Sequence, residues 1–112
     1  MELSVEKIEG IDFLRLYENV TFSNINEFKK MMEKLLEACS TALVLDMEKV
    51  SFINSTGIGI IAAAYSTLNK KQAKLVILRP KPEVARVLQI IGFDSVIPIS
   101  HDEQKALDIC LR

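Results

Sequence analysis

The sequence has little of what marks a secreted, membrane-bound or nucleic-acid-binding protein. Lysine plus arginine nearly balance aspartate plus glutamate, at 14 against 15, and the net charge of −1 offers no positive field to nucleic acid or anionic lipid. No apolar run reaches the ~18 residues of a membrane span, and no basic segment followed by a hydrophobic stretch opens the chain. We therefore expect no nucleic-acid partner, no membrane partner and a cytoplasmic location.

Cysteine is also scarce, with Cys39 and Cys110 far apart inside apolar helical patterns. Such positions suit buried thiols in a reducing compartment better than a disulfide scaffold. Because 49% of the 112 residues are hydrophobic and 26% are charged, the chain can bury a core without disulfides or metals. We expect one domain over residues 1–112, with no metal and no cofactor.

The first half of the chain predicts a hairpin and a helix. Residues 3–17, LSVEKIEGIDFLRLY, alternate apolar and polar side chains around Gly10, which is typical of an antiparallel hairpin with neither strand covered on both faces. A helical period of apolar residues, Ile25 to Cys39, follows. Ser23 is the expected N-cap of this helix.

Two continuous apolar runs, at residues 41–47 (TALVLDM) and 74–78 (KLVIL), are typical of strands covered on both faces. A helix that begins at the stretch NSTGIG separates them, and its segment IIAAA, residues 60–64, is expected to face the core. Lys70 and Lys71 would stabilise its C-terminal end.

The C-terminal third continues the alternation of helices and strands. Pro82 suits the first turn of a helix and Gly92 its C-terminal cap. A short strand is expected in SVIPI, residues 95–99, and Ser100 and Glu103 have capping-box spacing for a last helix. The expected fold class is thus one α/β domain: a mixed β-sheet with an N-terminal antiparallel hairpin and parallel central strands covered by helices.

The stretch VSFINSTGIG, residues 50–59, places two hydroxyls beyond the carboxyl end of a predicted parallel strand, where open α/β sheets meet ligands and partners. One interpretation is capping, in which Asn54 or Ser55 accepts a hydrogen bond from a free backbone N–H. Another is modification, since a serine at an exposed helix start, flanked by glycines, is accessible to a kinase and leaves room for a partner.

Two further interpretations, a hydrolase nucleophile and a phosphate-binding loop, fit the spacing poorly. A nucleophile elbow needs glycine two residues before the serine, where the chain has Ile53. The single histidine, His101, falls in the first turn of the last helix, a position more typical of a surface residue than of a general base. The phosphate-loop pattern GxxxxGK[ST] is absent. We expect no enzyme.

The stretches VSFINSTGIGIIAAAYSTLNKKQAKLVIL and PEVARVLQIIGFDSVIPI resemble the STAS domain of bacterial anti-sigma factor antagonists, and the resemblance extends over essentially the whole chain. The family hallmark is a buried strand, an aromatic residue and D-S-[ST]-G-[LI]-G at a helix start. It is matched in order by Asn54, Ser55, Thr56, Gly57, Ile58 and Gly59. A later pattern, P-x-V-x-x-x-[LI]-x-x-x-G, is matched by Pro82, Val84, Leu88 and Gly92.

The resemblance implies a partner-switching regulator that binds an anti-sigma factor and releases a sigma factor. In this family the anti-sigma factor is a serine kinase that phosphorylates the serine matching Ser55, which switches the antagonist off, and a serine phosphatase reverses the step. Residues 54–59 would contact the partner. Asn54 replaces the usual Asp, which keeps the capping oxygen and removes its charge. The segment YENVTFSN is a loose substitute for the family turn G-x-[LI]-[DN].

A second function stays open: a constitutive STAS interaction module of a transporter or a stress-signalling scaffold, without phosphorylation. The glycines do not decide between these functions. Gly57 and Gly59 are equally compatible with close packing of the helix on the sheet and with close approach of a partner.

Overall fold

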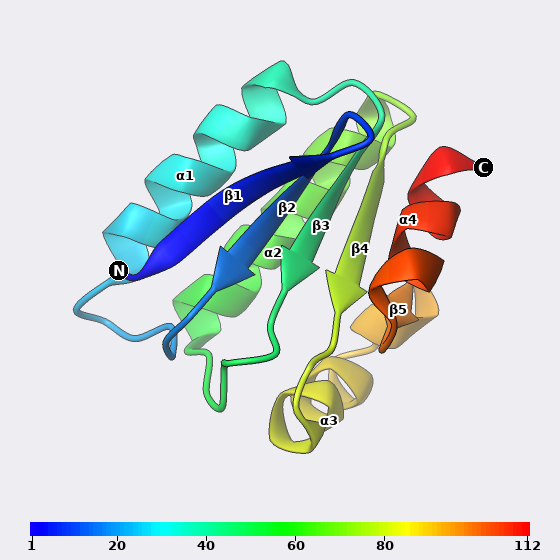
Figure 1. Cartoon of the computed structure of the whole chain (residues 1–112). Coiled ribbons are helices and arrows are strands. Elements are labelled where there is room, and N and C mark those ends of the chain that lie inside the picture. The colour runs from blue at the N-terminus through cyan, green and yellow to red at the C-terminus, as the bar shows by residue number, and fades with distance from the viewer.

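The computed structural model describes residues 1–112 as a five-stranded mixed sheet with helices on both faces (Figure 1). The strands are β1 (Leu3–Ile8), β2 (Ile11–Leu16), β3 (Ala42–Asp46), β4 (Lys74–Leu78) and β5 (Ile99–Ser100). The helices are α1 (Ile25–Ala38), α2 (Ser55–Lys70), α3 (Pro82–Ile90) and α4 (Glu103–Leu111), with a 3₁₀ turn η1 (Phe93–Ser95). The strands lie side by side in chain order; β1 is antiparallel to β2 and the other neighbours are parallel, which confirms the expected fold class.

The N-terminal hairpin forms as expected. Its two-residue turn, Glu9 and Gly10, has positive φ angles of 49° and 80°, the conformation that matches the twist of the flanking strands. The expectation that neither strand is covered on both faces is wrong for β2. Because β2 lies between β1 and β3, Phe13 is buried against the layer of α4 and Leu14 against the layer of α1 and α2.

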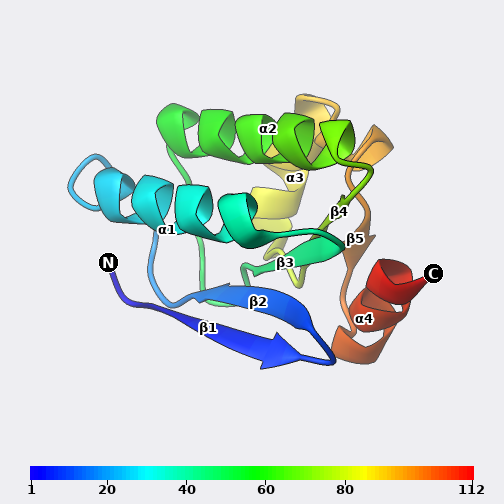
Figure 2. The same ribbon diagram turned by 90° about the horizontal axis from the view of Figure 1, so that it is seen from above.

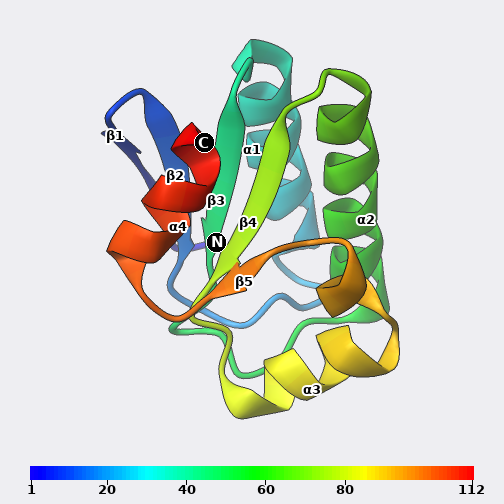
Figure 3. The same cartoon turned by 90° about the vertical axis from the view of Figure 1, so that its right-hand side faces the viewer.

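Helices cover the two faces unequally, as Figure 2 shows from above. Helices α1 and α2 lie on one face, over a main core of 22 buried residues that includes Phe28, Leu43 and Ile61. Helix α4 lies on the other face, over a smaller core of nine that includes Val44 and Leu107. Helices α1 and α2 therefore cover more of the sheet than α4, which Figure 3 shows on the opposite face.

Two of the expected helix caps are wrong by one or two residues. Asn24, and not Ser23, precedes α1, and the Ser23 hydroxyl lies 3.0 Å from the hydroxyl of Thr21. For α4 the N-cap is Asp102, whose Oδ1 accepts a hydrogen bond from the Lys105 N–H at 2.9 Å. Where several capping residues stand next to one another, spacing alone does not select among them.

Expectations for the second half of the chain are confirmed only in part. Pro82 occupies the first turn of α3, and Gly92 has a left-handed φ of 82° just after it, both as expected. The strand expected over residues 95–99 is reduced to Ile99–Ser100, because η1 takes up the preceding residues and Pro98 has no N–H for a strand ladder. Lys71, which was expected to stabilise the end of α2, also contacts another helix: its Nζ donates a hydrogen bond to Leu36 O near the end of α1, at 2.6 Å.

Candidate functional site

Helix α2 begins at Ser55 because Asn54 caps it. The Asn54 Oδ1 accepts a hydrogen bond from the Gly57 N–H at 2.7 Å, so Asn54 is the capping residue of the two that spacing allowed. Ser55 and Thr56 lie exposed in the first turn, which contains no acidic residue. The positive end of the helix dipole therefore faces solvent beside the two hydroxyls.

The start of α2 is fixed to a second loop, between β2 and α1. An isolated parallel bridge pairs Val20 with Ile53, and the Val20 N–H donates to Phe52 O at 3.0 Å. The Oδ1 of Asn19 accepts from the N–H groups of Ser51 and Phe52, at 2.7 and 3.1 Å. Figure 1 shows both loops at the same end of the sheet, where the parallel strands end. Two segments far apart in sequence thus form one continuous surface.

The two glycines of the site have different surroundings. A Cβ on Gly57 would lie 2.7 Å from Ile53 Cγ1 and 2.9 Å from Val20 Cγ1, closer than real Cβ contacts. A Cβ on Gly59 would meet no atom within 4 Å. Packing of the helix against the two loops thus explains Gly57, whereas no contact within the chain explains Gly59. In the IIAAA segment only Ile61 and Ala64 are fully buried, so the expectation that it faces the core holds in part.

Two aromatic side chains near this surface are exposed. Phe22, in the β2–α1 loop, is 92% exposed, and Phe52, in the β3–α2 loop, is 54% exposed. Phe22 follows Val20 by two residues and Phe52 directly precedes Ile53, so both belong to the bridged loops. The expected site, residues 54–59, includes neither of them; the available signal for Phe22 was its place among polar residues in YENVTFSN.

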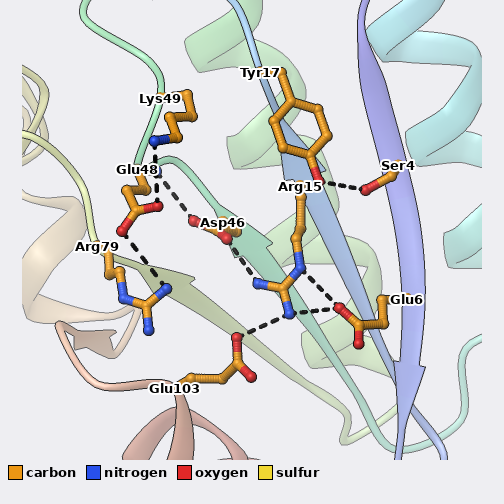
Figure 4. A network of polar contacts seen from close by, with 9 residues as sticks. All are labelled: Ser4, Glu6, Arg15, Tyr17, Asp46, Glu48, Lys49, Arg79 and Glu103. Atoms are coloured by element: carbon orange, nitrogen blue, oxygen red, sulfur yellow. Dashed lines mark hydrogen bonds and ion pairs between the residues drawn. The ribbon is translucent and has the colours of Figure 1, made fainter.

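A partly buried charge network lies on the other face of the sheet (Figure 4). The Arg15 guanidinium makes three ion pairs, each at 2.8 Å, with Asp46, Glu6 and Glu103. Burial of Arg15 by itself lowers its pKa, but the hydrogen bonds to the three carboxylates, first that to Asp46, raise the pKa above its usual value. The network joins β1, β2 and β3 to the start of α4 and is structural. Sequence spacing could not reveal it, because its members come from four elements.

The remaining features lie away from residues 54–59. A surface cavity of about 250 Å³ lies near the C-terminal end of α2, between Tyr65, Lys74 and Ile109, and no residue of 54–59 lines it. No group of three or more His, Cys, Asp or Glu side chains is placed to hold a metal ion. None of the helices is both long and apolar enough to cross a bilayer.

The fold thus combines a mixed sheet in chain order with a capped Ser-Thr-Gly helix start at its carboxyl edge. The STAS domain family model matches residues 2–106, so the chain belongs to the STAS domain family. BtrV of Bordetella bronchiseptica is 26% identical over 106 residues, which cover 95% of this chain and 91% of BtrV. The anti-sigma F factor antagonist of Paenibacillus polymyxa is 23% identical over 108 residues, which cover 96% and 92% of the two chains.

Other similar proteins are of two kinds. The crystal structure of an anti-sigma factor antagonist from Mycobacterium paratuberculosis has a TM-score of 0.89 at 22% identity, covering 99% of this chain and 94% of that one. The phosphorylated form of SpoIIAA from Bacillus has a TM-score of 0.77 at 18% identity, covering 99% and 100%. Sulfate transporter 1.3 of Arabidopsis thaliana is 27% identical over 120 aligned positions, covering 93% of this chain but 18% of the transporter.

Proposed function

We propose that the protein is an anti-sigma factor antagonist: it binds an anti-sigma factor that is a serine kinase and so frees a sigma factor. Phosphorylation of Ser55 switches it off, and a serine phosphatase restores it. The observation that carries the proposal is that capping and the exposed hydroxyl belong to different residues at the start of α2. Asn54 alone supplies the capping oxygen, which leaves the exposed Ser55 hydroxyl available for transfer of a phosphoryl group.

The electrostatics of the helix start favour the modified state. A phosphate carries about −1.5 to −2 charges, and free N–H groups and the positive end of the helix dipole stabilise an anion there. Because the first turn of α2 contains no carboxylate, the phosphate would meet no repulsion from its own turn. The protein would thus act by binding rather than by catalysis, in the cytoplasm.

Its relatives support this proposal in two ways. The Paenibacillus relative, which matches nearly the whole chain, is named an anti-sigma F factor antagonist. SpoIIAA, which shares the fold, is known in a phosphorylated form. The substitution of Asn54 for the family's aspartate is compatible with the proposal, since the cap needs only the side-chain oxygen.

The test is phosphoryl transfer. The protein is incubated with ATP and each kinase-type anti-sigma factor encoded in the same genome, and the modified residue is located by mass spectrometry. We expect one phosphate on Ser55, none on the Ser55→Ala variant, and unchanged modification of Thr56→Ala. Phosphate uptake by Ser55→Ala with unchanged stoichiometry would reassign the acceptor, and absence of both binding and phosphorylation with every candidate would reject the function.

A constitutive interaction module is the second candidate, favoured by the similarity to a segment that makes up 18% of an Arabidopsis sulfate transporter. In that case Ser55 is a contact residue only. Neighbouring genes distinguish the candidates: a gene for a kinase-type anti-sigma factor supports the first, and genes for transporter subunits support the second.

A further inference from the structure

We infer that Phe22 and Phe52 are the apolar anchors of the kinase interface, one from each bridged loop beside Ser55. This inference rests on the proposed function and adds the residues that carry the binding energy. A lone exposed apolar side chain needs no explanation. Here, however, two phenylalanines, 92% and 54% exposed, belong to the two loops that are hydrogen-bonded to each other at the start of α2.

The Phe22 loop is held in place by polar contacts and not by its aromatic ring. Asn24 Oδ1 accepts from the Thr21 N–H at 2.9 Å, and its amide donates to Asn19 O at 2.7 Å. Asn19 in turn accepts the two N–H groups of the β3–α2 loop. The ring therefore contributes little to the fold, while the backbone under it is fixed in advance. A preorganised aromatic side chain loses little entropy on binding and is typical of interface hot spots.

The position of the anchors specifies the partner. A kinase that phosphorylates Ser55 must bring its ATP site to the start of α2, and the surface around that point carries the two phenyl rings. The kinase should therefore present apolar recesses for two aromatic side chains next to its ATP site. The arrangement is also compatible with the switch, since a dianion on Ser55 would place its charge on the surface that the kinase must cover.

The experiment measures affinity for the kinase-type anti-sigma factor that phosphorylates the wild-type protein. The variants are Phe22→Ala, Phe52→Ala and the matched control Leu111→Ala, which removes a 50% exposed apolar side chain near the C-terminus, at the opposite end of the sheet (Figure 1). We expect each Phe variant to bind about 10- to 100-fold more weakly and the control to bind within about threefold of wild type. All three should unfold at the wild-type urea concentration.

Two results would overturn the inference while leaving the proposed function intact. The first is wild-type affinity of Phe22→Ala and Phe52→Ala for a kinase that still phosphorylates Ser55. The second is a wild-type protein that forms dimers, which Phe22→Ala dissociates without a change in kinase affinity; the rings would then serve a second copy of the chain. Failure of the wild-type protein to bind any kinase rejects the proposed function instead.

Discussion

At the scale of single residues, neighbours in the hallmark stretch have separate tasks. The Asn54 oxygen holds the helix start, and the Ser55 hydroxyl next to it takes no part in the cap. Gly57 leaves room for the neighbouring Ile53 side chain, whereas Gly59 adjoins open space. A sequence motif of this kind therefore combines positions required by the fold with positions that the fold leaves free. Single substitutions distinguish the two kinds of position by their effect on the free energy of unfolding.

The first prediction compares Asn54→Ala with Ser55→Ala. Loss of the Asn54 cap leaves the Gly57 N–H without its acceptor and should lower the free energy of unfolding by about 1 kcal/mol. Ser55→Ala should change it by less than about 0.5 kcal/mol, because Ser55 is exposed. Urea unfolding followed by circular dichroism measures both. Equal losses in the two variants would show that Ser55 has a structural role.

The second prediction concerns the two thiols. Cys110 lies on the buried side of α4, and this burial raises the pKa of its thiol to about 11, whereas Cys39 is partly exposed. A thiol reagent at neutral pH should modify Cys39 and leave Cys110 intact in the folded protein, which mass spectrometry can follow. Because the pKa of Cys110 is higher folded than unfolded, its contribution to stability is complete below about pH 9 and is lost as the pH rises toward 11. Cys110→Ser should remove this alkaline loss.

At the scale of elements, helix α2 combines a packed beginning with an open flank. Its buried residues Gly57, Ile61, Ala64 and Leu68 follow helical spacing and face the sheet. Gly59 lies outside this row, so the helix carries a glycine that its own packing does not need. Glycine in a helix interior is less favourable than alanine by about 0.5–1 kcal/mol. The two glycines should therefore respond in opposite directions to the same substitution.

The third prediction is that Gly59→Ala raises the free energy of unfolding by about 0.5–1 kcal/mol and that Gly57→Ala lowers it by about 1–3 kcal/mol. The loss at Gly57 arises because the new methyl group would lie 2.7 Å from Ile53 and 2.9 Å from Val20. Each variant serves as the control for the other in urea unfolding. A destabilised Gly59→Ala would contradict the open surroundings of this residue.

The fourth prediction concerns the attachment of α4. Replacing Arg15 by Met leaves the carboxylates of Asp46 and Glu103 near each other without their cation, and should cost about 2–4 kcal/mol at neutral pH. The loss should shrink in high salt, which screens the repulsion between the two carboxylates. The control is Glu6→Gln, which should cost less than about 1 kcal/mol because the Glu6 side chain is 58% exposed. A loss in Arg15→Met that salt does not alter would indicate a packing role for Arg15.

Elements with a strong repeating pattern of apolar residues were predicted correctly, whereas caps and tertiary contacts were not. The apolar runs at residues 42–46 and 74–78 and the helical period of α1 were found because burial repeats along the element. The caps of α1 and α4 were misplaced because several residues able to cap stand together. The Val20–Ile53 bridge and the Arg15 network depend on tertiary contacts, which no local pattern carries. The motif located the start of α2, but the second loop beside it came only from the structure.

At the scale of the whole molecule, the fifth prediction is that phosphorylation blocks a surface and leaves the fold unchanged. Backbone amide spectra of the two forms should be nearly identical outside residues 52–60, because the helix start can accept a dianion without rearrangement. One like charge on the partner at ~8 Å, with an effective dielectric of ~20–40, would cost about 2–4 kcal/mol, a 30- to 1000-fold loss of affinity that high salt partly relieves.

A conformational switch would give a different result. Chemical-shift changes that reach α4, together with an affinity loss that salt does not alter, would indicate a conformational switch. The control is the unphosphorylated protein, measured at low and at high salt, since its affinity at each salt concentration is the reference for the phosphorylated form.

The hydrogen bonds of Asn19 join it to Ser51 and Phe52, residues 32 and 33 positions further along the chain. The surface beside Ser55 therefore does not exist until both crossover segments have folded onto the sheet. A nascent or truncated chain that ends in α1 cannot compete for the partner, whatever its concentration in the cell. A partner that binds only the finished surface also protects it, because binding to the native state draws molecules away from unfolding and from proteolysis.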